Sequence, residues 1–212
     1  MEVLPISKKT KLIVLILIIT VFMVSFSEKA YVIDWEVFKN ENEAKLNKIN
    51  KTEDKVISKF NIAISKANLG QITESRKEFD EIKQLVEEKE FRNIISPYIK
   101  EIDEINDDIL YLNYGAFYYL IFDNNKKSAI YFEEIIKLEP ENIWALNYLA
   151  ANYIVLDNIN KAEKLLEKAD EINSNNFSNL LFGYIYYKEG NYLRAMSRFS
   201  QSGNLIKENF IE

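Results

Sequence analysis

Apolar positions recur at helical spacing along most of the chain, and between Asp108 and Glu208 the whole pattern repeats. The stretch that begins at Ile109 falls without gaps on the stretch that begins at Ile143, and a third copy begins at Asn176. These starts are 34 and 33 residues apart in the numbering, a period typical of stacked helix pairs. The pattern predicts three antiparallel helix pairs, over residues 108–141, 142–175 and 176–208.

Small residues fall at two equivalent positions in each unit. The first position holds Ala116, Ala150 and Gly183, and the second holds Ser128, Ala162 and Ala195. Because a larger side chain would hold two helices apart there, we expect the helices of each pair to cross closely at these points. Polar, helix-breaking residues follow the first helix of each unit: Asp123-Asn124-Asn125, Asp157-Asn158 and Glu189-Gly190-Asn191.

This pattern resembles the tetratricopeptide repeat family, whose units carry a large residue, Leu-Gly, Tyr, a turn, Ala, an aromatic residue, Ala and Pro in that order. The second unit matches with Leu146, Leu149, Ala150, Tyr153, Ala162, Leu166 and Ala169. The third matches with Gly183, Tyr186, Gly190, Ala195 and Phe199. The first matches with Ala116, Tyr119, Phe132 and Pro140, and departs at Ser128 and Ile135. The resemblance implies an all-α solenoid whose first helices line a concave groove.

The pattern is weaker upstream. Residues 53–88 predict a helix, a turn at Gly70 and a second helix, which form either a degenerate fourth unit or a plain helical hairpin. Ser96-Pro97 predicts the start of a spacer helix that completes the segment 53–107. Residues 28–52 are polar with scattered Trp35 and Phe38, and we interpret them as a linker helix rather than core.

The N-terminus predicts contact with a membrane. A basic tail, residues 1–11, precedes an uncharged apolar run of 16 residues, 12–27. At helical rise this run spans about 24 Å, short of the roughly 30 Å hydrocarbon core, so both a signal anchor and a signal peptide cleaved near Ser27 fit it. We favour an uncleaved single-pass helix in the cytoplasmic membrane. The lysines then stay in the cytoplasm and the repeats lie outside.

Composition argues against several classes of function. The net charge is −6, and residues 1–27 contribute +2, so the rest of the chain carries −8, which is unfavourable for nucleic-acid binding. His and Cys are absent, which removes the commonest general base and thiolate chemistry. We expect no catalytic residue, metal or cofactor. Export without disulfides, with many Lys, Ile and Asn residues, suggests a bacterial source.

The groove implied by the resemblance is the candidate site. Its positions are mostly apolar: Leu110, Asn113, Phe117, Trp144, Asn147, Ala151, Phe177, Leu180, Tyr184 and Lys188. An apolar face of this size must be covered. Three coverings remain open: a partner polypeptide, the chain's own residues 34–107, or a second copy. We expect Asn113 and Asn147 to hydrogen-bond a bound backbone.

These observations predict a non-enzymatic, membrane-tethered scaffold that binds a protein or peptide, as an adaptor in an envelope, secretion or pilus-type assembly. A chaperone-like binder of exported unfolded segments is the alternative. A hydrolase using scattered carboxylates such as Glu133 and Glu134 is a remote one. The C-terminal repeat ends without a polar capping helix, so Leu205, Ile206 and Phe210 could pair with another subunit.

Overall fold

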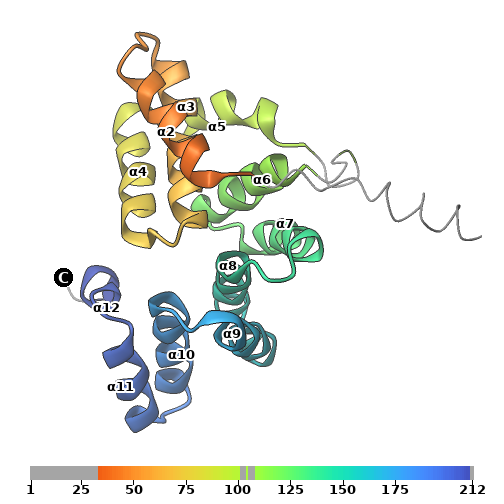
Figure 1. Cartoon of the computed structure of the whole chain (residues 1–212), viewed down its shortest axis with the longest axis vertical. Coiled ribbons are helices and arrows are strands. Elements are labelled where there is room, and N and C mark those ends of the chain that lie inside the picture. The colour runs from red at the N-terminus through yellow and green to blue at the C-terminus, as the bar shows by residue number, and fades with distance from the viewer. Residues whose placement is uncertain (1–32, 101–103, 105–107, 211–212) are drawn as a thin grey trace, which may run out of the picture. The chain divides into compact units, whose positions relative to one another are not determined.

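Regular structure is entirely helical in the computed structural model, which describes residues 33–100, 104 and 108–210, with side chains as far as Lys207 (Figure 1). The predicted basic tail and membrane segment, residues 1–11 and 12–27, lie outside the described residues. Within the described part of the chain, no helix has the length and apolar character needed to cross a bilayer.

The helices form antiparallel pairs, as the repeat pattern predicts. The expectation of an all-α fold of paired helices is therefore confirmed. Each predicted unit contains one pair: α6 (Ile109–Ile121) with α7 (Asn125–Leu138), α8 (Ile143–Val155) with α9 (Ile159–Asn173), and α10 (Asn176–Lys188) with α11 (Tyr192–Gln201). Upstream lie α2 (Trp35–Leu46), α3 (Thr52–Asn68), α4 (Ile72–Leu85), α5 (Glu88–Ile95) and the short 3-10 helix η1 (Ser96–Tyr98). The last described helix is α12 (Leu205–Phe210).

Four hairpins, α3–α4 included, close with the same turn. Its central residue has a left-handed backbone in each case: Gly70 (φ 76°), Asp123 (φ 55°), Asp157 (φ 58°) and Gly190 (φ 76°). The next N–H in each turn donates to the carbonyl five residues back, as Asn158 N does to Tyr153 O at 2.8 Å. This is the Schellman ending of a helix. The upstream hairpin is thus built like the three clear units.

Each hairpin crosses at its small residues. Ser128 Oγ donates to the carbonyl of Ala116 at 2.9 Å, and Ser75 Oγ makes the same bond to Ala63 at 2.8 Å. A side chain larger than Ser at either position would separate the helices. The equivalent residues of the other two hairpins, Ala162 and Ala195, are also buried.

Helix α2 is part of the packed structure, which corrects its prediction as a linker. Asn42 is buried, and its side-chain oxygen accepts a hydrogen bond from Asn61 Nδ2 at 3.0 Å. Asn61 Oδ1 in turn accepts from the hydroxyl of Tyr114 at 2.6 Å. Because these buried amides are hydrogen-bonded, a helix of polar composition can still pack closely along α3.

The α3–α4 hairpin packs on both the first and the second clear unit. Phe79 stacks on Phe117 with ring centroids 6.1 Å apart. The turn at Gly70 reaches α8, where a Cβ added to Gly70 would lie 2.1 Å from Cζ2 of Trp144. The segment α5–η1 makes up the longer connection between this hairpin and α6, so the hairpin is not held to the spacing of the other units.

An ion-pair cluster joins α3 to α4. Burial opposes ionisation of Glu78, but hydrogen bonds from Lys66 and Lys59, at 2.7 and 3.0 Å, outweigh it and lower the pKa of this carboxyl. The cluster therefore stabilises the hairpin through a partly buried carboxylate rather than through apolar contact alone.

Gly70→Ala should destabilise the protein more than Gly190→Ala. Both glycines have φ 76°, where alanine costs about 1–2 kcal/mol. Only Gly70 of the two meets another side chain, since among the described atoms nothing lies within 4 Å of a Cβ added at Gly190. Overpacking against Trp144 adds about 1–3 kcal/mol. Urea unfolding of both variants measures the difference, and equal losses would show that Trp144 does not constrain the turn.

Candidate binding cleft

The ten predicted groove residues do not form one open surface. Five are buried by this chain itself: Asn113, Phe117, Asn147, Phe177 and Leu180. Leu110, Trp144, Ala151 and Tyr184 are partly exposed, and Lys188 is exposed. Because these five side chains are buried in this arrangement of the helices, a partner cannot contact them through an open groove.

The chain's own helices cover the predicted groove where it runs along α6, which corresponds to the second of the three predicted coverings. Asn68 Nδ2 donates to Asn113 Oδ1 at 2.8 Å, and Asn113 Nδ2 donates to Ile109 O at 2.8 Å. Asn147 Nδ2 donates to Asn175 Oδ1 at 3.1 Å. Both side chains are buried, and the amide nitrogen of each donates to a group of this chain, so in this arrangement neither is open to a partner's backbone.

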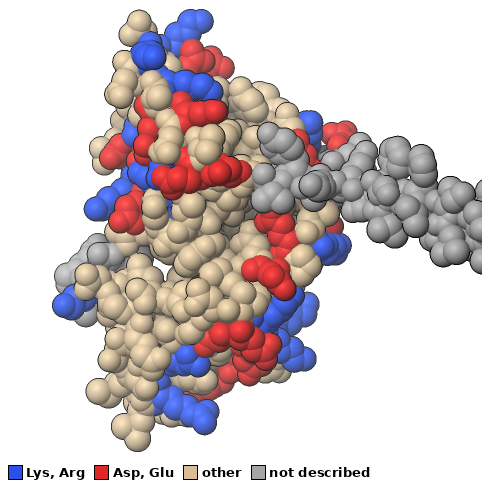
Figure 2. Space-filling model, viewed as in Figure 1, with Lys and Arg blue, Asp and Glu red and all other residues tan. Residues whose placement is uncertain are grey.

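A cleft of about 340 Å³ remains open beside Trp144. The turn before α4, the starts of α8 and α10, and α12 enclose it, and in Figure 2 the surface is hollowed at the left, between the start of α4 and α12. Its lining residues are Gly70, Ile72, Thr73, Glu74, Trp144, Asn175, Asn176, Phe177 and Leu205.

The cleft combines apolar walls with a polar rim. Trp144, Phe177 and Leu205 come from three different helices and supply much of the apolar surface. Glu74 and Asn176 are exposed at the start of α4 and α10. Sites of this size that bind small groups or side chains have such a composition. A second hollow, of about 420 Å³ between α2 and α3, contains none of the predicted groove residues.

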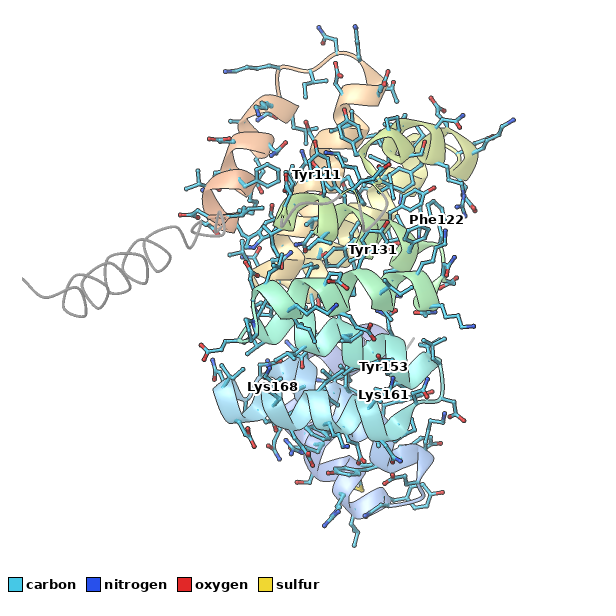
Figure 3. All side chains as sticks on the ribbon, turned by 90° about the vertical axis from the view of Figure 1, so that its right-hand side faces the viewer. Tyr111, Phe122, Tyr131, Tyr153, Lys161 and Lys168 are labelled. Atoms are coloured by element: carbon cyan, nitrogen blue, oxygen red, sulfur yellow. The ribbon has the colours of Figure 1, made fainter. Side chains whose placement is uncertain are left out.

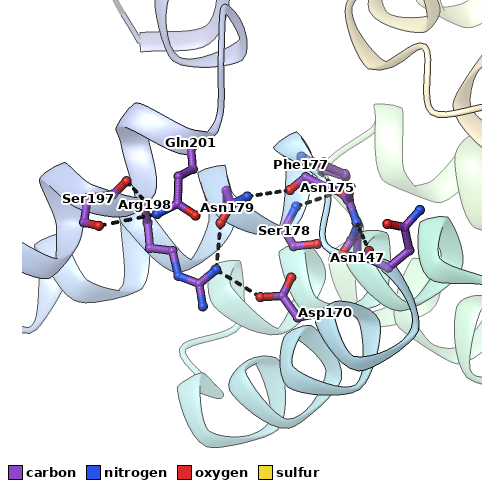
Figure 4. A network of polar contacts seen from close by, with 10 residues as sticks. Asn147, Asp170, Asn175, Phe177, Ser178, Asn179, Ser197, Arg198 and Gln201 are labelled. Carbon is purple, nitrogen blue, oxygen red and sulfur yellow. Dashed lines mark hydrogen bonds and ion pairs between the residues drawn. The ribbon is translucent and has the colours of Figure 1, made fainter.

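A chain of polar contacts leads from the cleft into the C-terminal hairpin (Figure 4). Asn175 Oδ1 accepts from the backbone N–H groups of Phe177 and Ser178, both at 3.0 Å, and so caps α10. Arg198 Nη1 donates to Asn179 at 2.7 Å and to Asp170 at 2.9 Å. The cap that positions Phe177 in the cleft is thus coupled to both neighbouring hairpins.

Away from the cleft, basic side chains lie over tyrosine rings at one repeated position. Lys127 lies over Tyr119, Lys161 over Tyr153 at 4.9 Å, and Arg194 over Tyr186 at 5.6 Å. Figure 3 shows Lys161 close to Tyr153 on the face made by the clear units. Each cation covers a ring that would otherwise meet solvent.

Burial raises the pKa of several tyrosines. The Tyr153 hydroxyl also donates to Glu133, and its pKa is raised to about 12. Burial shifts Tyr114 and Tyr148 in the same direction, so the pKa of each hydroxyl lies above its ordinary value. All three therefore stay protonated at neutral pH, and they act here as hydrogen-bonding and packing groups.

Glu133 and Glu134, the carboxylates named in the hydrolase hypothesis, form contacts that stabilise the fold. Glu133 accepts the hydrogen bond from Tyr153, and Glu134 pairs with Lys137 at 2.6 Å across one turn of α7. Within the described ranges, no group of three or more Asp or Glu residues is placed to hold a metal ion.

The sequence alone did not identify most of the cleft. Trp144 and Phe177 were among the predicted positions, but Ile72, Asn176 and Leu205 were not. The turn at Gly70 has the same form as the three clear turns, and this signal could have placed α3–α4 as a full repeat. Its contact with α8 depends on the long connection to α6, whose path the repeat pattern does not specify.

Comparison with known proteins identifies no family. No family model matches the chain, and no curated protein matches it. A solved structure described as "MamA RS-1 ArsTM double mutant" aligns over 88% of this chain and 99% of its own, at 14% sequence identity and a TM-score of 0.46. At this sequence identity and TM-score, the similarity assigns neither a fold nor a function. The fold is therefore assigned from the helix pairs and turns described above.

Asn175→Ala should cost more stability than Asn142→Ala. Each residue caps a helix, and loss of such a cap costs about 1 kcal/mol. Asn175 also accepts from buried Asn147, and an amide left without a partner costs a further 1–3 kcal/mol or so. Thermal unfolding of both variants gives the difference. If the two losses are equal, Asn147 does not depend on this bond.

Proposed function

We propose that this protein is a non-enzymatic scaffold, tethered to the outer side of a cytoplasmic membrane, that holds a segment of one partner polypeptide in the cleft beside Trp144. The partly exposed Trp144, flanked by Phe177 and Leu205 at the cleft, carries this proposal. Tryptophan is enriched among the residues that contribute most of the binding energy in protein interfaces.

The dimensions of the cleft favour a specific partner over a broad range of clients. A volume of about 340 Å³ accommodates one or two side chains, whereas α3–α4 covers the groove expected from the sequence where it runs along α6. A binder of unfolded segments needs an extended and adaptable apolar surface. We therefore rank an adaptor in an envelope, secretion or pilus-type assembly above a chaperone-like role.

The rim supplies groups for orienting a bound segment. Asn176 is exposed beside Phe177, and Glu74 is exposed at the opposite side of the cleft. An extended segment that inserts an apolar side chain can meet these groups with its backbone or with a basic residue. A partner segment with an apolar anchor and a neighbouring Lys or Arg fits this arrangement.

Membrane tethering rests on the sequence of residues 1–27. The lysines at 8, 9 and 11 precede the apolar run, which orients such a segment with its N-terminus in the cytoplasm. The helix pairs would then lie outside. A protein held at the membrane by this segment, with a cleft that binds a partner, would act as an adaptor.

A photo-crosslinking residue at Asn176 should capture one partner in intact cells. The matched control is Asn160, which is exposed on α9 away from the cleft. We expect one dominant crosslinked protein from position 176 and little from 160. Trp144→Ala should then weaken binding of that protein by about 2 kcal/mol, or roughly thirty-fold.

Three results would contradict the proposal. Equal labelling at positions 176 and 160 would place the partner elsewhere. Many weak crosslinked clients would favour the chaperone-like role. Unchanged affinity of the Trp144→Ala variant, with an intact helical spectrum and unfolding midpoint, would remove Trp144 as the anchor.

Protein recovered from membranes should have the full mass of 24.9 kDa, because we infer that residues 1–27 stay attached. The chain lacks Cys, so single cysteines report topology directly. A membrane-impermeant thiol reagent added outside the cell should label Asn160→Cys and leave Lys9→Cys unlabelled. A mass lower by residues 1–27 would show cleavage, and the reverse labelling would invert the orientation.

A further inference from the structure

The C-terminal hairpin exposes large apolar side chains on α11 and on the end of α10. The exposed fractions are 84% for Leu193, 69% for Met196, 62% for Tyr192 and 58% for Tyr187. Isolated apolar side chains on a surface are ordinary, but a cluster indicates contact with another body. We refer to these four residues as the α11 face.

The four side chains form one patch. Tyr187 and Tyr192 are in ring contact across the turn, with centroids 5.8 Å apart. Tyr192 and Met196 are four residues apart on one helix, and Leu193 and Met196 are three apart, so each pair is adjacent on the helix surface. The α11 face is therefore continuous from the end of α10 along the first two turns of α11.

The repeat pattern accounts for part of this apolar character, because Tyr187 and Tyr192 correspond to Ile154 and Ile159 of the second unit. The positions of α9 equivalent to Leu193 and Met196 are Asn160 and Glu163, and Asn160 is exposed. In α7 the position equivalent to Leu193 is exposed Lys126. The third hairpin thus departs from both neighbours at Leu193, where they are polar and exposed, and from the second unit at Met196.

The charge of this hairpin also differs from the rest of the chain. Helix α11 contains Arg194 and Arg198 and no Asp or Glu, with Glu189 and Glu208 on either side of it in the sequence, although the whole chain has a net charge of −6. The equivalent helices α4, α7 and α9 all contain acidic residues. In Figure 2 the surface over α11, at the lower left, is tan with blue at its edges.

Ion pairs compensate part of this positive charge. Arg198 pairs with Asp170 at 2.9 Å, and Lys188, at the end of α10, pairs with Asp157 at 3.2 Å. Arg194 is exposed beside Leu193, and Lys207 is exposed on α12. Of these two side chains, Arg194 directly follows Leu193 of the α11 face and is positioned to meet an anionic surface there.

A second copy of this chain is a poor occupant for the α11 face. Four side chains are far fewer than the roughly 20–30 residues a side of a stable interface. The C-terminal residues Leu205 and Ile206, expected to pair with another subunit, are partly buried against the core of their own chain.

We propose that the α11 face docks on the anionic surface of the bilayer that holds the tether, with Leu193 and Met196 inserted among the lipids and the tyrosines at headgroup level. This inference rests on the proposed tether, which keeps the face close to lipid at high effective concentration. A few inserted side chains then suffice as a second attachment. Tyrosine is enriched at this depth of a membrane.

The test uses the full chain reconstituted in vesicles, with an environment-sensitive fluorophore on Leu193→Cys or, as the matched control, on Asn160→Cys. Vesicles contain phosphatidylcholine alone or with roughly one-third phosphatidylglycerol, because each basic residue near an anionic surface adds measurable attraction. We expect a blue shift and quenching by a lipid-attached nitroxide at position 193 in anionic vesicles, and neither effect at position 160.

Substitutions separate insertion from attraction. Met196→Asp should abolish the quenching at position 193 without unfolding, since Met196 is 69% exposed. Arg194→Gln should weaken the docked state about five-fold. Flotation of the same samples with the vesicles reports the tether independently.

A chain that floats with an exposed probe at position 193 keeps the proposed tether and overturns the docking. A probe that is shielded equally in neutral and anionic vesicles, and increasingly with protein concentration, shows contact between protein copies and also overturns it. A chain that does not float removes the tether and the docking together.

Discussion

Each hairpin of this protein depends on a close approach of two helices at a point where only a small side chain fits. Ser75, Ser128, Ala162 and Ala195 occupy that point in the four hairpins, and all are buried. The two serines add a hydrogen bond to the carbonyl of the facing helix. Because the crossing sets the angle and separation of each pair, the turn after the first helix must reverse the chain tightly, and a left-handed residue does so in every case.

The upstream hairpin obeys the same local rules but lies differently among its neighbours. In a simple stack each unit contacts the next along the chain. The α3–α4 hairpin, released from that spacing by α5–η1, contacts α6 through Phe60 and reaches α8 through Gly70. It covers a surface that the repeat pattern leaves apolar, and what remains is the cleft beside Trp144.

The repeat register could be predicted from the sequence because small residues and turns are local signals that recur at fixed intervals. The positions at 116, 128, 150 and 162 needed no knowledge of the tertiary structure. The burial of Asn113 and Phe117 could not be predicted in this way. It depends on contacts with Asn68 and Phe79, which lie upstream of the repeating segment. Helix α2 was misjudged for a related reason: its composition is polar, and its buried Asn42 is stabilised by an amide in α3 rather than by apolar packing.

The contact between the turn at Gly70 and the ring of Trp144 joins residues more than seventy positions apart in the chain. Linear helical arrays lose their hairpins one at a time from the ends, because each hairpin interacts with its nearest neighbour. Here the first hairpin also interacts with the third, so fraying from the N-terminal end would uncover rings in two units at once. The Trp144 side of the cleft and the N-terminal half of the array therefore belong to one cooperative block, and the C-terminal hairpin, which supplies Phe177 to the cleft, is joined to that block through α8 and α9.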